Sequence, residues 1–371
     1  MDCGNNDILQ RLVLLHFSGK GRGYAMPLTT VHRLMESDAL VAVDGLEECS
    51  VHITVTSPPY PMIRMWDSIF SEQDDRVARA FEAQDGEKAF EAIHSRFDQL
   101  WSLLHSKTSD GGILCINIGD ATRSIGGRFR SFSNHARIIS GCVRAGFDML
   151  PEIVWRKQSN RPNKFLGSGM LPPTAYPSQE HEFILIFRKG GPRRFENTDA
   201  RARRRRSAFF WEERNRWFSD LWDDIHGVRQ NSGSLRERNR TAAYPAELPY
   251  RLINMFSIIG DTVLDPFSGT GSTSVAAAAS CRNSISVESS ESLVSMSSAR
   301  MLDCIDECVS LVSGRIASHI KFISSRDRRG KHISQRYGFG VVSSQERDIS
   351  IPVPLSVSAD GEGRFTVLYE E

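Results

Sequence analysis

The sequence lacks the features that mark membrane, secreted and strongly charged proteins. It has no run of about 18 consecutive apolar residues and no basic-then-apolar segment after Met1, so it indicates neither a membrane span nor export. The net charge is only +1, which favours no particular partner. We therefore expect a cytoplasmic protein, and its 371 residues are enough for one large α/β core plus an inserted or appended module.

Cysteine is present but is nowhere clustered. The seven cysteines are scattered singly, mostly inside apolar stretches, and only Cys304 and Cys308 stand one helical turn apart. A zinc site would need further ligands that this spacing does not supply. The sequence therefore predicts reduced thiols in the core and no metal site.

A glycine-containing loop, Asp-Pro-Phe-Ser-Gly-Thr-Gly-Ser-Thr at 265–273, joins two predicted elements. Residues 262–264 before it are typical of a buried strand, and the small residues 274–280 after it favour a helix. The two glycines permit a ligand to approach the backbone closely, while free N–H groups at the start of the helix point toward it. Glu288 ends the next strand about twenty residues later, where such folds place a ribose-binding carboxylate. The pattern predicts a nucleotide-type cofactor site.

A second motif, Ser-Pro-Pro-Tyr at 57–60, directly follows the predicted strand 51–56. Its two prolines end the strand and remove two backbone donors, which leaves carbonyl groups in a rigid loop free to accept hydrogen bonds. Ser57 Oγ and the Pro58 carbonyl can accept from the two N–H groups of a nucleobase amino group, and Tyr60 offers a face on which an extruded base can stack. The alternative is a rigid strand-ending turn, which the companion glycine loop makes less favourable.

Together the two motifs resemble those of the amino-group DNA methyltransferases of bacterial restriction–modification systems. Their order, catalytic first and cofactor second, resembles the circularly permuted β group. With serine at its head, the motif Ser-Pro-Pro-Tyr resembles that of the cytosine-N4 enzymes more than that of the adenine-N6 enzymes, which usually carry Asp or Asn there. The resemblance covers about 36–190 and 242–300. It implies an α/β, Rossmann-like S-adenosylmethionine-dependent methyltransferase fold with a mostly parallel seven-stranded sheet in permuted order and an inserted DNA-recognition module.

The resemblance also implies roles for individual residues. The methionine end of S-adenosylmethionine would lie over 265–271, its ribose on Glu288 and its adenine near Asp38, where Ser37 replaces the usual Gly. The segment that begins at Tyr244, where family members often have His, would line the pocket. The implied catalytic residues are Ser57, Pro58, Pro59 and Tyr60. The implied cofactor-binding residues are Asp38, Pro245, Asp265, Pro266, Phe267, Gly269, Thr270, Gly271, Ser272 and Glu288.

Residues 191–241 differ from the rest in composition, with thirteen arginines against eight acidic residues. A run of charge is usually a solvated face, but beside the expected active half it favours phosphate contact and DNA recognition. The residues concerned are the consecutive Arg203, Arg204, Arg205 and Arg206. Lys157 belongs to a segment that resembles the family's Trp-x-Lys loop near the flipped base, and the polar loop 120–134 could reach DNA or cofactor.

These inferences divide the chain into five parts. We expect an N-terminal arm, a catalytic half, a target-recognition insertion, a cofactor half and an accessory C-terminal tail, at 1–35, 36–190, 191–241, 242–300 and 301–371. Further strands are expected at 112–118, 147–155 and 182–187, a helix at 135–145, and a strand pair in the tail at 349–357 and 364–369.

The expected function is methyl transfer from S-adenosylmethionine to cytosine N4 in duplex DNA after base flipping. Such an enzyme serves a bacterial or archaeal restriction–modification system, with double-stranded DNA as partner and a cognate restriction endonuclease as functional partner. Two alternatives stay open: an adenine-N6 methyltransferase, and a catalytically silent DNA-binding protein of the same fold. An NTPase is disfavoured because the glycine loop lacks the phosphate-loop lysine, and a cytosine-C5 enzyme because no cysteine follows a proline.

Overall fold

The protein is built around one large mixed sheet. The computed structural model describes residues 28–157, 166–226, 244–326 and 330–370. The residues outside this part are 1–27, 158–165, 227–243, 327–329 and 371. They include most of the expected N-terminal arm and the end of the expected insertion. The described sheet has eleven strands in the order β11-β7-β10-β3-β2-β12-β13-β1-β17-β16, with β6 also paired to β10. Its strands are β1 Thr29–Glu36, β2 Val51–Thr56, β3 Thr108–Ile118, β6 Phe147–Met149, β7 Ile153–Arg156, β10 His181–Lys189, β11 Leu221–Trp222, β12 Thr262–Asp265, β13 Asn283–Glu288, β16 Val353–Ala359 and β17 Arg364–Glu370.

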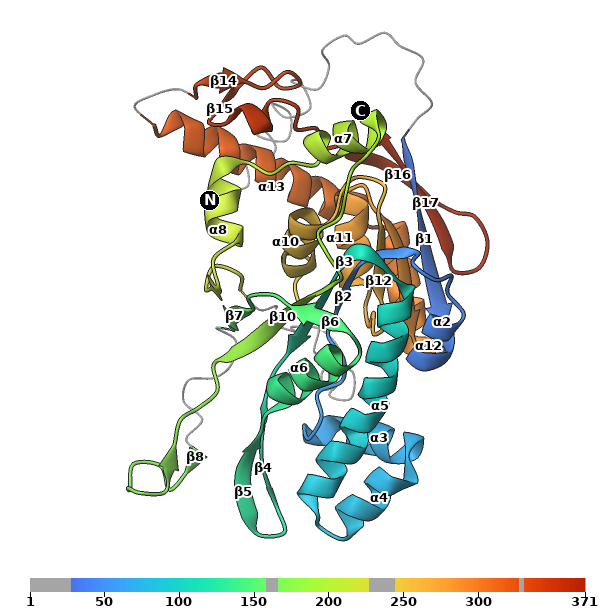
Figure 1. The fold of residues 1–371 in the computed structure, drawn as a ribbon, viewed down its shortest axis with the longest axis vertical. Coiled ribbons are helices and arrows are strands. Elements are labelled where there is room, and N and C mark those ends of the chain that lie inside the picture. The colour runs from blue at the N-terminus through green and yellow to red at the C-terminus, as the bar shows by residue number, and fades with distance from the viewer. Residues whose placement is uncertain (1–27, 158–165, 227–243, 327–329, 371) are drawn as a thin grey trace.

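Helices cover both faces of this sheet, and three small hairpins lie outside it (Figure 1). The helices are α2 Ala39–Asp44, α3 Asp67–Gln73, α4 Asp75–Glu82, α5 Gly86–Lys107, α6 Asn134–Arg144, α7 Thr198–Arg206, α8 Trp211–Trp217, α10 Glu247–Phe256, α11 Ser272–Ala279, α12 Glu291–Leu302 and α13 Ile305–Ser324, with short η1 Arg64–Trp66 and η2 Ser344–Glu346. The hairpins pair β4 Ala121–Ile125 with β5 Arg128–Phe132, β8 Leu166–Gly167 with β9 Ala175–Tyr176, and β14 His332–Ile333 with β15 Gly340–Val341. No helix in the described ranges is long and apolar enough to cross a membrane.

The centre of the sheet is parallel and permuted. Strands β3, β2, β12, β13 and β1 are parallel neighbours, so the late strands β12 and β13 lie between the early strands β2 and β1. This confirms the expected α/β architecture and its permuted order. The sheet is wider than the seven strands expected, because β11, β6 and the tail strands β16 and β17 extend it. The carboxyl ends of all five central strands therefore meet at one edge.

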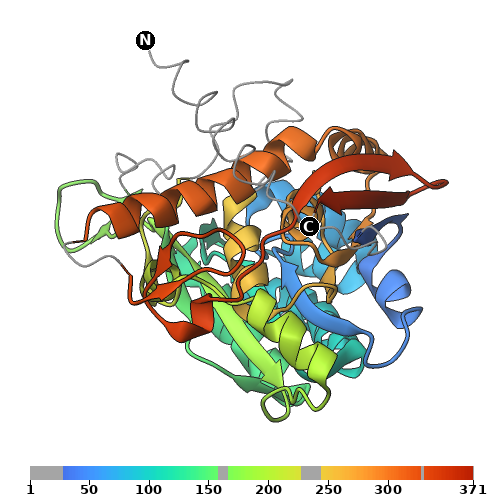
Figure 2. The same cartoon turned by 90° about the horizontal axis from the view of Figure 1, so that it is seen from above.

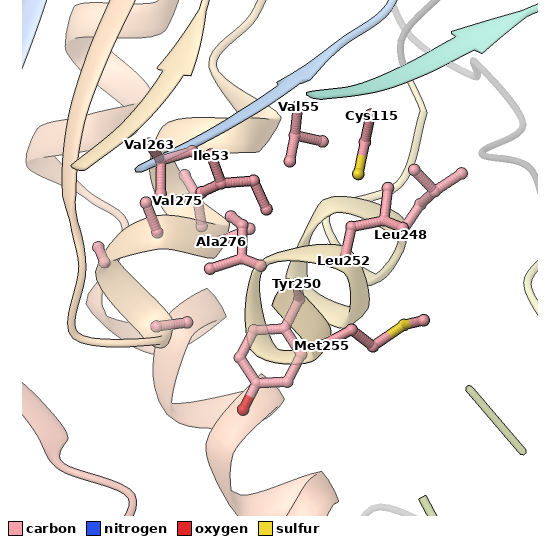
Figure 3. Close-up of a cluster of buried hydrophobic side chains, with 14 of the residues drawn as sticks. Ile53, Val55, Cys115, Leu248, Tyr250, Leu252, Met255, Val263, Val275 and Ala276 are labelled. Carbon is pink, nitrogen blue, oxygen red and sulfur yellow. The ribbon is translucent and has the colours of Figure 1, made fainter. Parts of the chain in front are cut away.

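Alternation along the central strands divides the core between the two faces. Ile113 and Cys115 of β3 belong to a cluster with α10 and α11, whereas Leu114 and Ile116 belong to a cluster with α5. Figure 3 shows the first cluster, where Ile53, Val55 and Cys115 face side chains of α10 such as Leu248. The alanines of α11 let that helix pack closely against the sheet. Burial on both faces explains why these strands are almost uniformly apolar in sequence.

Two expected elements differ in the structure. The single strand expected at 147–155 is two strands, β6 and β7, because Pro151 between them has no N–H to donate to a ladder. The polar loop expected at 120–134 is the antiparallel hairpin β4–β5, closed by Gly126 and Gly127 at positive φ. Figure 1 shows this hairpin projecting beyond the sheet.

The tail is part of the sheet and not an appendage. Strand β17 pairs with β1, and Figure 2 shows the β16–β17 pair beside α13. Glu212, His319 and Glu346 join the tail to α8, with ligand-type atoms within 4.8 Å of one another. His319 Nδ1 lies 2.8 Å from Glu212 Oε1, its Nε2 lies 3.0 Å from the Gly340 carbonyl, and Trp211 N–H donates to Glu346. These hydrogen bonds hold the tail against α8, which explains why the three side chains lie together.

Candidate active site

The loops after the parallel strands meet over one cavity at the carboxyl edge of the sheet. Its volume is about 330 Å³, within the roughly 300–1,000 Å³ typical of ligand sites. The Ser-Pro-Pro-Tyr loop and the glycine loop both line it, as the permuted order requires. Its lining includes 37–40, 57–60, Trp66, Ile69, Phe70, Ile93, Arg96, Phe97, Leu100, Tyr244, 266–270, Ser272, 288–290 and Leu293.

Tyr60 is held at the catalytic end of the cavity by a polar network. Its hydroxyl donates to Glu182 Oε2 at 2.9 Å and accepts from Ser57 Oγ at 3.2 Å and Asn117 Nδ2 at 2.8 Å. Lys157 Nζ lies 2.7 Å from the other oxygen of Glu182. Burial and then the charge on Glu182 raise the pKa of Tyr60 well above its usual value, so its hydroxyl stays protonated.

Topology brings these groups together. Ser57 and Tyr60 follow β2, and Asn117 lies next to the last residue of β3. Strand β10 runs antiparallel to β3 with Phe183 opposite Ile118, so its first residues, including Glu182, lie at the carboxyl edge of β3. A Cβ at Gly119 would lie 3.1 Å from Tyr60 Cε2 and 3.4 Å from Glu182 Cγ, so glycine makes room for the pair.

Asp265 joins the catalytic strand to the cofactor loop. Its carboxylate accepts from Thr56 Oγ1 at 2.8 Å, from Thr273 Oγ1 at 2.6 Å, from the Tyr244 hydroxyl at 3.3 Å and from Phe267 N at 3.1 Å. Complete burial nevertheless raises the pKa of Asp265 to about 6. The side chain does not line the cavity. Its hydrogen bonds position the loop, and its expected contact with the cofactor stays a prediction.

The two glycines of the loop have different structural roles. Both have positive φ, 52° at Gly269 and 82° at Gly271. A Cβ at Gly269 would meet no heavy atom within 4 Å, so this part of the loop leaves open space beside the cavity. A Cβ at Gly271 would lie 2.5 Å from Ser297 Oγ, so the second glycine lets α11 begin close to α12. Gly271 does not line the cavity.

Two carboxylates stand where ribose and adenine contacts are expected. Glu288 accepts from Gly269 N at 3.0 Å and from Ser290 N at 2.9 Å, which fixes it beside the loop. Asp38 caps α2 by accepting from Leu40 N and also accepts from Arg96 at 2.6 Å. Both side chains line the cavity with their expected neighbours, whereas Pro245 does not; Tyr244 occupies that place.

The arginine run lies at the other edge of the sheet. Arg203 to Arg206 end α7, and Ser207 just after them accepts from Ile259 N, close to the start of β12. Arg203 is also near Gly260, 3.4 Å from the position of a Cβ there. Figure 1 places α7 far from the β4–β5 hairpin. The run thus lies away from the cavity, and its expected contact with DNA stays a prediction, while Lys157 lies at the site through Glu182.

Sequence reasoning missed several residues of the site. Asn117 and Glu182 complete the network around Tyr60, and Arg96 holds Asp38. A carboxylate at the start of the apolar strand 182–187 was a signal that could have been used, because a buried charge needs a partner. The apolar residues of α5 belong to the core, and Ile93, Phe97 and Leu100 among them also form one wall of the cavity.

Comparison with known proteins identifies the family. A family model described as DNA methylase, covering N6 and N4 methyltransferases, matches residues 51–299. The chain belongs to this family. The type II methyltransferase M.MthZI of Methanothermobacter thermautotrophicus is 44% identical over 345 residues, which cover 93% of this chain and 96% of that protein. M.MjaI of Methanocaldococcus jannaschii is 48% identical over 280 residues, 72% of this chain and 90% of that protein.

Solved structures agree with this assignment. A putative DNA modification methylase from Thermus thermophilus, in complex with S-adenosyl-L-methionine, is 30% identical, covers 76% of this chain and 95% of its own, and has a TM-score of 0.57. PvuII DNA methyltransferase, named cytosine-N4-specific, is 19% identical with a TM-score of 0.52 and shares the fold. The protein is a type II DNA methyltransferase of the N4-cytosine or N6-adenine class, and S-adenosylmethionine is its cofactor.

The cavity fits this cofactor in chemistry. Glu288 and Asp38 offer carboxylate oxygens for hydroxyl and amino groups, and each keeps lone pairs beyond the bonds it already accepts. Apolar side chains of α5 and Phe267 offer faces for a purine ring. The loop beside Gly269 leaves room for close approach.

Proposed function

We propose that this methyltransferase modifies the exocyclic N4 of cytosine in duplex DNA. The observation that carries the proposal is Ser57, which lines the cavity at the head of Ser-Pro-Pro-Tyr with a neutral oxygen. Resemblance to the cytosine-N4 enzymes supports it, since the adenine-N6 enzymes usually have Asp or Asn at this position. PvuII methyltransferase, which shares the fold, is itself named cytosine-N4-specific.

We assign different roles to the residues at the two ends of the cavity. We assign the cofactor to the side of Glu288, Asp38 and the loop 266–270; when bound, S-adenosylmethionine supplies an electrophilic methyl group. At the other end, Ser57 Oγ and the Pro58 carbonyl accept the two N–H groups of the target amine, and Tyr60 stacks on the extruded base. Transfer requires the amine to be held at about 3–3.5 Å from the methyl carbon. The rigid proline loop supplies this orientation.

Ser57 offers a neutral hydroxyl at the position where the resemblance associates serine with cytosine. In the structure it donates to the Tyr60 hydroxyl at 3.2 Å, so its lone pairs are left for the N–H groups of the target amine. An ionised Asp at this position can only accept. Adenine also presents an amino group, so the product must be measured.

We propose that duplex DNA approaches the carboxyl edge of the sheet. The β4–β5 hairpin projects on this side and carries Arg123, Arg128 and Arg130 (Figure 1). Arg128 is exposed, whereas Arg123 is paired with Asp67 and Arg130 with Glu87. Cationic side chains on this side of the sheet suit phosphate contacts on both sides of an extruded base.

Product analysis tests the proposal. DNA methylated by the protein is digested to nucleosides and weighed, and N4-methylcytosine is expected. N6-methyladenine without N4-methylcytosine would replace the cytosine proposal by the adenine one. Methylation-sensitive sequencing of DNA from cells expressing the protein then gives the recognition site. If that site is cut by an endonuclease of the same host and methylation blocks the cut, the role in restriction–modification is established.

A further inference from the structure

A directed chain of hydrogen bonds leads from the cavity to a buried carboxylate. Ser57 Oγ–H donates to the Tyr60 hydroxyl, and Tyr60 O–H donates to Glu182 Oε2. The directions follow from the neighbours. Asn117 Nδ2 can only donate and Glu182 has only acceptor oxygens when ionised, so the single hydrogen of Tyr60 belongs to Glu182. Ser57 then turns its lone pairs toward the cavity.

The reaction needs such a chain. An amine that accepts a methyl group becomes positively charged and must lose a proton to give a neutral product. Ser57 is too weak a base to keep that proton. In the related enzymes with Asp at the head of the motif a carboxylate stands beside the amine, whereas here the hydrogen-bonded path from that position ends at Glu182.

We propose that Glu182 is the terminal acceptor of the amine proton, which reaches it through Ser57 and Tyr60. This inference rests on amino-group transfer within the proposed function and holds for either base. The amine N–H bond breaks and its proton binds Ser57 Oγ. Ser57 passes its own proton to the Tyr60 oxygen, and Tyr60 passes its proton to Glu182 Oε2. Ser57 and Tyr60 end as they began, a new O–H bond exists on Glu182, and no group is oxidised or reduced.

The surroundings of the three residues suit a relay. Burial keeps the Tyr60 hydroxyl protonated by raising its pKa, so it conducts a proton and does not hold a charge. Lys157 contacts Oε1 of Glu182 at 2.7 Å and leaves Oε2 to Tyr60 and Asn117. Glu182 is only 6% exposed, so water does not compete at its oxygens.

Tyr60→Phe separates the relay from base stacking, because phenylalanine keeps the aromatic ring and loses only the hydroxyl. We expect single-turnover methylation of unmodified bacterial genomic DNA, with methyl-tritiated S-adenosylmethionine, to slow by about 100-fold or more. Cofactor affinity and melting temperature should not change. Glu182→Gln should cause a similar loss. The double variant should be no slower than either single variant, because either substitution alone already interrupts the proton transfer.

Solvent isotope effects give a second readout. The wild-type rate should fall in D₂O with a non-linear dependence on the deuterium fraction, since several protons move, and Tyr60→Phe should lose this dependence. Glu180→Gln is the matched control: that carboxylate is two residues away, partly exposed and paired with Arg156, and its loss should leave the rate unchanged. Tyr60→Phe at close to the wild-type rate, or additive losses in the double variant, would overturn the relay. Nucleoside analysis of the same reactions tests the base assignment separately.

Discussion

The two edges of the central sheet are built from the same strands but differ in what their side chains leave open. At the carboxyl edge, β2 and β12 end in Thr56 and Asp265, which are bonded to each other beneath a cavity. At the amino edge, the buried Asp261 accepts 2.6 and 3.0 Å hydrogen bonds from Arg193 and a further one from Ile258 N. Asp261 at the amino edge is thus paired within the fold, whereas the carboxyl edge presents acceptor groups to a cavity.

This difference shows that strand direction locates the site better than charge density does. The densest arginine run, at 203–206, is beside the amino edge. The groups to which we assign the chemistry are few, mostly neutral or acidic, and lie where parallel strands end. Substitutions at the two edges should therefore have very different effects, and the following experiments test that contrast from the largest effect to the smallest.

Loss of the Tyr60 side chain should have the largest effect. Tyr60→Ala removes both the stacking face and the hydroxyl, so we expect single-turnover methylation to fall by about a thousandfold, from base stacking and proton transfer together. Cofactor affinity measured by isothermal titration should stay near that of the wild type. Ser57→Ala should follow the same pattern with a smaller loss. A parallel fall in cofactor affinity would mean that the two ends of the cavity are not separate.

Glu288→Ala should act at the opposite end of the same cavity. We assign Glu288 to the ribose, and it orders the Gly269 loop, so removing its carboxylate should raise the dissociation constant of S-adenosylmethionine by about 10- to 100-fold, as for lost hydrogen bonds to a charged group. Titration calorimetry measures it directly. Glu291→Ala is the control, since Glu291 is exposed in the first turn of α12. Unchanged affinity in Glu288→Ala would refute the ribose assignment.

The sequence predicted the parts of the site that depend on a motif and missed those that depend on pairing between strands. Ser57 to Tyr60 and the loop after β12 could be located because proline and glycine have local backbone consequences. Asn117 and Glu182 were missed, because Asn117 reaches Tyr60 through the parallel pairing of β3 with β2 and Glu182 through the antiparallel pairing of β10 with β3. The tail was described as accessory because nothing in its strand pattern shows that β17 pairs with β1. Register between distant strands is set by tertiary packing.

Asp265 should make stability depend on pH. Its pKa in the folded state, about 6, is above its ordinary value of 3.8, so the folded protein holds this proton more tightly than the unfolded chain does. The resulting stabilisation is complete below pH 4 and is lost as pH rises through 6, by about 3 kcal/mol. Urea unfolding from pH 4 to 7.5 should show this fall in the wild type relative to Asp265→Asn, in which the group cannot titrate. The same pH dependence in both proteins would contradict it.

The smallest effect should come from the arginine run, and it compares the two edges directly. Replacing Arg203 to Arg206 by alanine should leave the salt dependence of DNA binding almost unchanged, because α7 lies at the amino edge. Replacing Arg128 on the β4–β5 hairpin should instead lower the slope of log affinity against log salt by about 0.9 for the phosphate contact it loses. Both variants are titrated with the same duplex over a range of salt, with cofactor affinity as the control for folding. A flattened slope in the four-alanine variant, with Arg128→Ala at the wild-type slope, would move the DNA to the amino edge. The target base would then need a different path to Tyr60, since parallel strands separate the two edges by their full length.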